Sequence, residues 1–353
     1  MSSSQTSTSN AGTAERAPRV TIGMPVYNGQ RFVRATLDSL LAQTFTDFEL
    51  LICDNASTDS TEQICREYAA RDPRVRYVRN ERNIGPAPNY NKCFELARGE
   101  LFKWSAADDT IAPDFLARCV AELDRDPSLA GCYTRTTEID ADGKELYKHT
   151  TVLNLDSPSV LRRLASYTFV NHRRHAAPEL WAVWRADVLR RWKPLKGSFP
   201  CADRLVILRA ALHGPVRRIE EHLFFNRSHG QRSQTYLDKM KVRPGSRLVK
   251  YVGCGPLPSY EWWDANMKGR IVFPEWRWVW EYVKAVHDTP MPAGSKLASY
   301  AILAGLAVKF IPRLGRDVVL AAEILFNRAT GLAPKPQAPA SGNPVAGSPA
   351  VRN

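Results

Sequence analysis

The sequence lacks the short motifs of several common nucleotide-binding and metal-binding classes. No G-x-G-x-x-G segment follows the first predicted strand and no G-x-x-x-x-G-K-[S/T] segment occurs, which disfavours a dinucleotide-dependent dehydrogenase and a P-loop NTPase. The cysteines are spread singly without a C-x-x-C pair, so we expect reduced, buried thiols rather than disulfides or a zinc site. They are Cys53, Cys65, Cys93, Cys119, Cys132, Cys201 and Cys254.

Long apolar segments are also scarce. Residues 1–17 are rich in serine and threonine and contain no apolar core segment, so we expect a disordered leader over 1–18 rather than a signal peptide or membrane anchor. The stretch 297–308 is almost wholly apolar, but a bilayer crossing needs about twenty residues. We therefore expect a buried or interfacial helix there. Residues 331–353, rich in Ala, Pro, Gly and Ser, are expected to form a disordered tail.

The charge is strongly basic. A formal net charge of +13 and a pI near 9.5 suit nucleic acid, an anionic membrane face or a polyphosphate-bearing substrate as partner. The basic residues of the first half are scattered, and no helix-turn-helix, zinc-finger or ribonucleoprotein aromatic signature occurs. We therefore expect no nucleic-acid partner.

Short apolar runs alternate with helical periods from residue 19 to residue 125. This alternation predicts an α/β fold with a mostly parallel central sheet covered by helices on both faces. Beyond about residue 130 the alternation weakens, a mainly helical region covers 158–212, and further strands are expected near 131–137 and 217–225. The four predicted strands of the first part are Val20–Met24, Phe48–Cys53, Val75–Val78 and Leu101–Trp104.

Polar side chains follow each of these strands. Ligands of such sheets bind at the carboxyl ends of the strands, so this register predicts a binding rim. Adjacent carboxylates can hold Mg²⁺ or Mn²⁺ against a diphosphate, although two acids before a helix are also a common helix N-terminal signal. The rim residues are Tyr27-Asn28, Asp54-Asn55, Asn83 and Asp108-Asp109.

Five motifs, in this order and spacing, resemble the family-2 nucleotide-sugar glycosyltransferases with the GT-A fold. They are Val20-Thr-Ile-Gly-Met-Pro-Val-Tyr-Asn28, Asp54-Asn-Ala-Ser-Thr-Asp59, Asn83-Ile-Gly85, Ala97-Arg-Gly99-Glu100 and Asp108-Asp109. The resemblance is specific over 19–125 and extends more weakly to about 232.

The resemblance implies one Rossmann-like GT-A domain over 19–235, with a nucleotide-sugar-binding half at 19–125 and an acceptor and catalytic half at 126–235. A helical extension at 236–330 would follow. It further implies a hexosyltransferase-like enzyme that moves a sugar, with inversion, from a nucleoside-diphosphate donor to a glycan or lipid-linked acceptor. Cell-surface polysaccharide or glycoconjugate synthesis is the expected context.

The resemblance also assigns roles to the rim of the donor half. Pro25 and Tyr27 would line the base pocket, Asp54 would accept a hydrogen bond from a base N–H, and Asn83 and Asn89 would lie near the ribose or base. The alternative for Asp54 is that Asp-Asn starts a turn. The alternative for both asparagines is hydrogen bonding within the loop and helix.

The family's metal motif usually reads Asp-x-Asp, and this chain departs from it. Alignment of the last acid on Asp108 places Ala106 where the first acid normally stands. Asp108 is then the expected ligand of Mn²⁺ or Mg²⁺, and Asp109 is either a second contact or a group that orients a metal-bound water. The diphosphate would supply more of the coordination shell.

An inverting transfer also needs a base for the acceptor hydroxyl. The family places an acid in the helix-rich second half, and Asp203 matches that position; the alternative is an N-cap for the helix 205–212. His229 and Arg232 would close over the diphosphate, against the alternative of a solvated basic loop. Glu179, His172 and His175 are weaker candidates, because a histidine beside tryptophans usually has satisfied packing.

Two other functions stay open from the sequence. A catalytically silent GT-A module that binds a sugar nucleotide or a partner is permitted by Ala106. A nucleotidyltransferase is less favoured, since residues 24–29 offer no glycine-rich, basic loop after the first strand. The expected location is cytoplasmic, with the apolar C-terminal helix and the basic charge favouring the anionic inner face of the cell membrane.

Overall fold

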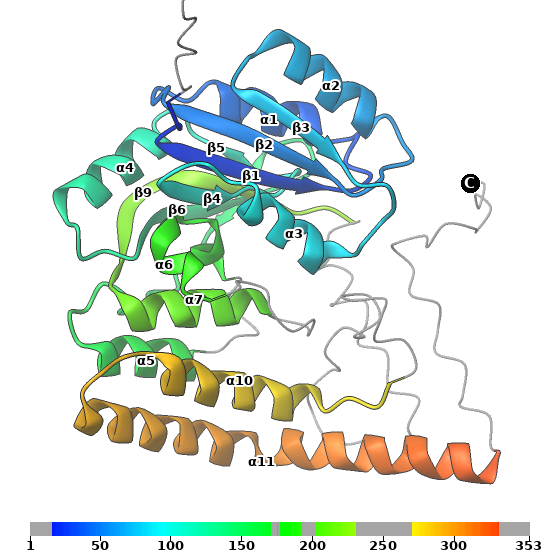
Figure 1. Ribbon diagram of the computed structural model, residues 1–353, viewed down its shortest axis with the longest axis vertical. Coiled ribbons are helices and arrows are strands. Elements are labelled where there is room, and N and C mark those ends of the chain that lie inside the picture. The colour runs from blue at the N-terminus through cyan, green and yellow to red at the C-terminus, as the bar shows by residue number, and fades with distance from the viewer. Residues whose placement is uncertain (1–15, 171–174, 176, 193–201, 231–269, 332–353) are drawn as a thin grey trace, which may run out of the picture.

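The computed structural model describes residues 16–170, 175, 177–192, 202–230 and 270–331. Most of the expected leader and tail, and the candidates His172 and Arg232, lie outside this described part. A nine-stranded sheet forms the upper part of the molecule in Figure 1, and layers of helices lie beneath it.

The first half of the chain forms the expected parallel sheet. Its strand order is β3-β2-β1-β4, and the three neighbouring pairs are all parallel. All four predicted strands are confirmed, with the bounds β1 (Val20–Val26), β2 (Phe48–Asp54), β3 (Val75–Arg79) and β4 (Leu101–Trp104). The helices of this half are α1 (Val33–Leu41), α2 (Thr61–Arg71), α3 (Pro86–Glu95) and α4 (Phe115–Arg125).

The second half extends the same sheet with strands of both directions. β8 is antiparallel to β4 and to β6, β9 is parallel to β6, and β5 and β7 add antiparallel edges. The α/β fold class is therefore confirmed, and the sheet as a whole is mixed. The bounds are β5 (Thr110–Ile111), β6 (Gly131–Ile139), β7 (Glu145–Lys148), β8 (Val183–Arg185) and β9 (Val216–Arg227).

The period of two along β2 explains why helices cover both faces of the sheet. Leu50 and Ile52 belong to the apolar core shared with α1, α2 and α4. Leu51 and Cys53 point to the opposite face and belong to the core shared with α3 and the second half of the chain. A strand with apolar residues on both faces has to be covered on both sides.

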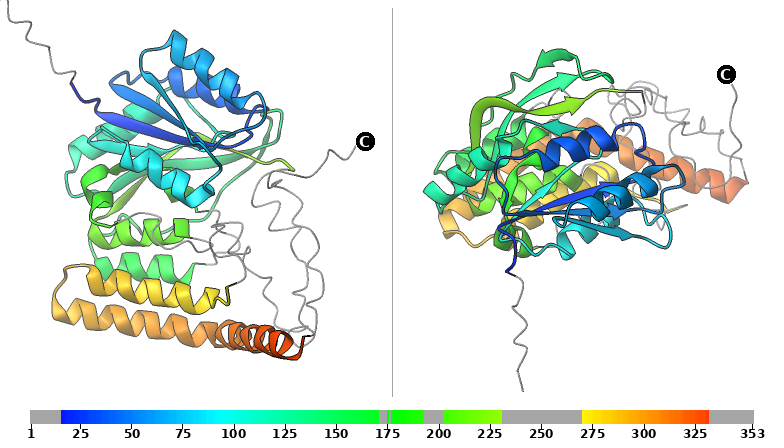
Figure 2. Two further views of the ribbon diagram at one scale, coloured as in Figure 1. Left: turned by 45° about the vertical axis from the view of Figure 1, so that its right-hand side comes forward. Right: turned by 90° about the horizontal axis from the view of Figure 1, so that it is seen from above.

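Helices of the second half form the lower layers. α5 (Val160–Phe169) and α7 (Ala202–His213) lie under the sheet, and α10 (Pro274–Asp288) and α11 (Ala293–Thr330) form the outermost layer, as the two views of Figure 2 show. The short elements η1 (Pro178–Trp181) and α6 (Ala186–Arg190) flank β8. One apolar core runs through all these layers.

The helix expected over 297–308 is much longer than its apolar stretch. It is part of α11, which has 38 residues and contains an 18-residue window of mean hydropathy 1.4, of which 28% is buried. By length and composition alone, α11 is able to cross a membrane. Apolar residues continue at helical spacing past Lys309 and Arg313, so the apolar stretch alone predicted too short a helix.

Five described cysteines are buried, as expected, and form no disulfide within the described residues: Cys53, Cys65, Cys93, Cys119 and Cys132. Burial raises the pKa of the Cys65 thiol to about 12, so this group stays a neutral thiol. Cys201 and Cys254 lie outside the described residues.

Candidate functional site

The loops after β1 and β2 are bound to each other at the carboxyl edge of the sheet. Asn28 donates its backbone N–H to Ser57 Oγ at 3.0 Å, and its own Oδ1 accepts the N–H of Thr58 at 2.8 Å. The N–H of Gly29 reaches Thr61 Oγ1 at 2.8 Å. Asn28 has a positive φ of 49°, which an asparagine tolerates better than most residues. This part of the rim is therefore preorganised.

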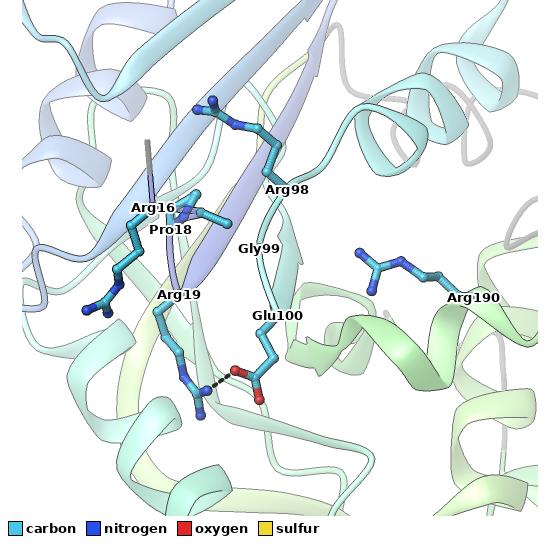
Figure 3. Close-up of a pocket in the computed structure, with 8 residues that line it drawn as sticks. Arg16, Pro18, Arg19, Arg98, Gly99, Glu100 and Arg190 are labelled. Atoms are coloured by element: carbon cyan, nitrogen blue, oxygen red, sulfur yellow. Dashed lines mark hydrogen bonds and ion pairs between the residues drawn. The ribbon is translucent and has the colours of Figure 1, made fainter. Parts of the chain in front are cut away.

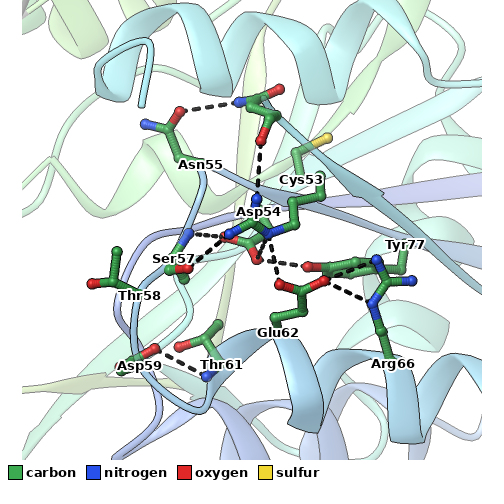
Figure 4. A network of polar contacts seen from close by, with 12 residues as sticks. Cys53, Asp54, Asn55, Ser57, Thr58, Asp59, Thr61, Glu62, Arg66 and Tyr77 are labelled. Carbon is green, nitrogen blue, oxygen red and sulfur yellow. Dashed lines mark hydrogen bonds and ion pairs between the residues drawn. The ribbon is translucent and has the colours of Figure 1, made fainter. Parts of the chain in front are cut away.

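Asp54 ends β2 and is fully buried. Its Oδ1 accepts the N–H of Ser57 at 2.9 Å, and its Oδ2 accepts the hydroxyl of Tyr77 at 2.6 Å, as Figure 4 shows. Burial and the Asp54 carboxylate raise the pKa of Tyr77, which keeps its proton for this bond. The turn interpretation accounts for the Ser57 contact, and the Tyr77 contact ties β2 to β3. A contact of Asp54 with a base stays a prediction.

The two asparagine candidates differ in their surroundings. Asn83 is exposed, and its Oδ1 accepts from Asn55 Nδ2 at 2.8 Å. Asn89 is buried; its Nδ2 donates to the carbonyl of Cys53 at 2.8 Å, and its Oδ1 accepts from Asn80 Nδ2 at 3.0 Å. Asn89 thus ties α3 to the end of β2, while Asn83 keeps a surface toward solvent.

The two residues expected at the base pocket also differ. Pro25 is buried inside β1, in register with Cys53 of β2. Tyr27 follows the strand directly and is half-buried. Only Tyr27 of this pair retains substantial surface at the rim.

Asp108 and His229 lie together, although 121 residues separate them in the chain. His229 Nε2 is 2.9 Å from Asp108 Oδ2, and the Asp108 side chain is 30% exposed. The ring of Phe32 packs against the His229 imidazole with 4.5 Å between centroids. The sequence predicted separate metal and diphosphate roles for these two residues, and the fold brings both to one place.

Asp109 has a different orientation from Asp108. It is buried, its Oδ1 accepts the backbone N–H of Arg227 at 2.8 Å, and its carbonyl accepts from Thr36 Oγ1 at 2.8 Å. These contacts connect the end of β9 with α1. They favour a supporting role for Asp109 over that of a second direct metal contact.

Arg227 is a site residue that the sequence reasoning missed. Its Nε donates to the carbonyl of Asp108 at 2.8 Å, and its Nη1 donates to the carbonyls of Asp140 at 3.2 Å and Ala141 at 3.0 Å. Its buried guanidinium thereby joins the Asp108 turn to the hairpin between β6 and β7. The sequence feature that could have identified Arg227 is its place just after the predicted strand 217–225 and two residues before His229.

The Asp108–His229 pair fits a divalent cation. Mg²⁺-type sites commonly use one or two protein ligands and fill the other positions with water and substrate phosphates. Asp108 Oδ2 and His229 Nε2 lie 2.9 Å apart and contact each other directly, so the same two atoms would hold a bound cation. The described residues contain no group of three or more His, Cys, Asp or Glu suited to a metal, so diphosphate oxygens would have to complete the shell.

Asp203 lies in the first turn of α7, where an acid also favours the helix dipole. Its Oδ1 is buried and has no hydrogen-bond partner within the described part of the chain. The pKa of the Tyr90 hydroxyl is raised. Burial is the largest cause, and the charges of Asp108, Asp109, Cys93 and Asp203 add to it in that order. One phenol on α3 therefore lies within electrostatic reach of both the metal candidate and the base candidate.

The weaker candidates form a packed pair. His175 Nε2 is 3.0 Å from Glu179 Oε1, and both side chains are buried beneath the sheet. The expectation of satisfied packing for His175 agrees with this contact.

A cavity of about 340 Å³ lies at the opposite, amino edge of the parallel strands (Figure 3). It contains several arginines that already have acidic partners: Arg19 pairs with Glu100, and Arg98 lies 2.9 Å from Glu49. These pairs and its position at the starts of β1 and β4 separate it from the Asp108 site.

Comparisons with known proteins bear on the same region. The model of the family described as glycosyl transferase family 2 matches residues 21–197, half of the chain. Chondroitin synthase of Escherichia coli is 38% identical over 133 residues, which cover 38% of this chain and 19% of the synthase. Hyaluronan synthase of Pasteurella multocida is 34% identical over 128 residues, 36% of this chain and 13% of that protein.

The alignments thus span less than a fifth of the length of these two synthases. Among solved structures, S. aureus TarS 1-349 in complex with UDP-GlcNAc superposes with a TM-score of 0.51 at 16% identity. The superposition covers 89% of this chain and 92% of that one. At this identity the likeness concerns the fold alone.

Proposed function

The chain belongs to glycosyltransferase family 2, and on this basis we propose that it transfers a sugar from a nucleoside-diphosphate donor to a glycan or lipid-linked acceptor. The proposed reaction inverts the anomeric centre and depends on Mn²⁺ or Mg²⁺. Family membership favours this function over nucleotidyl transfer.

The observation that carries the proposal is the proximity of Asp108 and His229 at the carboxyl edge of the parallel strands. These two side chains would hold the cation, and Arg227 would fix the turn that carries Asp108. The bound cation would neutralise the charge that develops on the leaving diphosphate. Arg232 stays a proposed diphosphate contact from the sequence.

The nucleoside would bind along the rim made by the loops after β1 and β2. Tyr27 would provide apolar surface for the base, and Asn83 a polar contact near the ribose. Asp54 would accept a base N–H, because an ionised carboxylate has about four acceptor positions; Ser57 and Tyr77 use two of them, and Arg79 Nε lies 3.8 Å from Oδ2. Pro25 and Asn89 would support this pocket from beneath, since both are buried.

Asp203 would take the proton of the acceptor hydroxyl. Its buried Oδ1 without a described protein partner supports this role, because such an oxygen gains a hydrogen bond when a hydroxyl arrives.

The names of the two synthases favour a polysaccharide or glycoconjugate product. A cytoplasmic location would give the enzyme access to nucleotide sugars. The division into a donor half at 19–125, an acceptor half at 126–235 and a helical extension at 236–330 is part of this proposal.

The test is a screen of UDP-, GDP- and dTDP-sugars by calorimetry and by donor hydrolysis, each with Mn²⁺, with Mg²⁺ and with EDTA. We expect one donor class to bind and to be hydrolysed only when a metal is present. Tight binding without hydrolysis or transfer would instead identify the silent module that Ala106 permits. Absence of binding by all three classes with Mn²⁺ would overturn the proposal.

A further inference from the structure

Helix α11 carries one set of buried and one set of exposed apolar side chains. One face packs against α10 and α5 through Leu303, Leu306, Phe310 and Leu314, which are all buried. Large apolar side chains are also exposed on α11, which belongs to the outermost layer in Figures 1 and 2. At about 100° per residue, six of them form one stripe about 100° wide beside the buried face. These six are Leu297, Val308, Ile311, Val318, Leu325 and Phe326; Val319 and Ile324 are exposed as well.

Helix α10 adds two exposed tryptophans to this layer. Trp276 and Trp280 are 49% and 57% exposed and lie one helical turn apart. Trp276 Nε1 donates to the carbonyl of Leu314 at 3.0 Å, so its indole lies directly against α11. Tryptophans are enriched where a protein meets the boundary between lipid and water.

The charges around these side chains favour an anionic partner. Helices α10 and α11 together hold seven Lys and Arg and five Asp and Glu residues, a net positive charge. Lys309 is exposed, and Arg277 is exposed and pairs with Glu281 at 2.8 Å. Of the acids, Glu275, Glu281 and Asp317 are buried, whereas Asp288 is exposed and pairs with Arg209.

A buried charge network keeps α11 attached to the rest of the fold. Arg316 Nη2 lies 3.3 Å from Glu275 Oε1, and the backbone N–H of Glu275 donates to Asp317 Oδ2 at 2.7 Å. Insertion of α11 across a bilayer would separate these charges and expose Arg316 and Asp317 to hydrocarbon, which is unfavourable for charged side chains. The network therefore favours an α11 that lies along a membrane over one that crosses it.

We propose that the outward face of α11, with Trp276 and Trp280 of α10, docks on an anionic lipid bilayer with α11 parallel to its plane. This membrane face consists of those two tryptophans and the six exposed apolar residues of α11 named above. Its apolar side chains enter the boundary of the acyl chains, and the neighbouring basic groups meet the lipid headgroups. The docking is independent of the proposed transfer reaction.

The test uses the full chain and vesicles of phosphatidylcholine alone or with about a third phosphatidylglycerol. In flotation experiments we expect binding to the anionic vesicles, weakened by added salt as surface charges are screened. The variant Val308→Glu/Ile311→Glu should bind about tenfold more weakly or worse, because two charges enter the apolar face. The matched control is Leu146→Glu/Tyr147→Glu, which changes two apolar residues on β7 that are also more than half exposed, and it should bind as the wild type does.

Thermal unfolding and sugar-nucleotide affinity should be the same in all these proteins, which separates a docking defect from misfolding or loss of the donor site. A blue shift of tryptophan fluorescence on vesicle addition, reduced in Trp276→Phe/Trp280→Phe, is a second expected readout. Equal vesicle binding by wild type and Val308→Glu/Ile311→Glu would overturn the proposal. So would a dimer in sedimentation equilibrium that dissociates in this variant without vesicle binding, since a second copy would then cover the face.

Discussion

Arg227 holds the carbonyl of Asp108 through its side-chain Nε at 2.8 Å. The guanidinium contacts the backbone carbonyl of Asp108, and the Asp108 carboxylate pairs with His229. Arginine suits this task because its planar fork donates in several fixed directions and keeps its charge. The orientation of Asp108 is thus set by a residue that the acid-pair motif does not contain.

We predict that Arg227→Met lowers the affinity for Mn²⁺ in the presence of nucleotide by about 10- to 100-fold, as observed when groups that orient metal ligands are removed. Arg227→Lys should lose most of the same affinity, since an ammonium does not reproduce the fork. Arg135→Met, which removes a surface pair with Glu220, is the control and should keep wild-type affinity. Calorimetric titration decides, and unchanged affinity in Arg227→Met would show that Asp108 needs no such support.

Asp108→Asn should reduce metal-dependent donor hydrolysis and transfer by about 100-fold or more, because the cation loses its carboxylate ligand. The control is Asp142→Asn, an exposed acid of the hairpin that contacts Arg227. Steady-state rates over a range of Mn²⁺ concentrations provide the measurement. Wild-type rates in the Asp108 variant would remove this residue from the metal site.

Asp203→Asn should bind the donor normally and lose transfer, since the amide keeps the shape of the side chain but accepts no proton. Asp187→Asn is a matched control, because Asp187 is likewise an acid in the first turn of a helix, α6, and is exposed. Donor affinity and transfer rate are measured separately. If both variants transfer at the wild-type rate, Asp203 serves only the helix dipole.

Asp54→Asn should lower the affinity for UDP or another nucleoside diphosphate by about tenfold. This factor corresponds to the loss of one charge-assisted hydrogen bond of about 1.4 kcal/mol. The companion variant Tyr77→Phe removes only the hydroxyl bond to Asp54 and should leave nucleotide affinity nearly intact. Should both variants bind equally well, the carboxylate would act in the turn alone.

Lys103 provides a prediction for pH dependence. It is fully buried in β4, donates to the carbonyl of Trp104 at 2.9 Å, and burial lowers the pKa of its amine to about 8. Between about pH 8 and its ordinary value of 10.5 the unfolded chain binds this proton and the folded chain does not, so this group makes stability rise with pH. Below pH 8 the whole cost of the buried charge is present.

We therefore expect Lys103→Met to have a higher free energy of unfolding than the wild type, with the largest difference near pH 7. The difference should decrease by roughly 3 kcal/mol as the pH rises from 7 to above 10.5. Urea unfolding of both proteins at several pH values measures it, and groups common to both proteins cancel in the comparison. A difference that is independent of pH would show that Lys103 keeps an ordinary pKa.

Much of the fold was predictable because its signals are local. Each parallel strand is a short apolar run with a polar end, and each helix between them has an apolar face with a period near 3.6. The two-residue β5 and the three-residue β8 are too short to carry such a period, so the mixed part of the sheet did not follow from the pattern. Helix α11 was underestimated because its basic residues interrupt an apolar stretch without ending the helix.

The sequence by itself determined the parallel core, the family and the polar rim on which Asp54, Asn83 and Asp108 lie. Only the tertiary structure decided that Asp54 is buried against Tyr77, that Asp109 supports β9, and that His229 reaches Asp108. The physical reason is that strand ends are set by local periodicity, whereas the direction of a side chain at a strand end depends on which distant strand pairs beside it. Here that strand is β9, whose pairing with β5 and β6 brings Arg227 and His229 to the Asp108 turn.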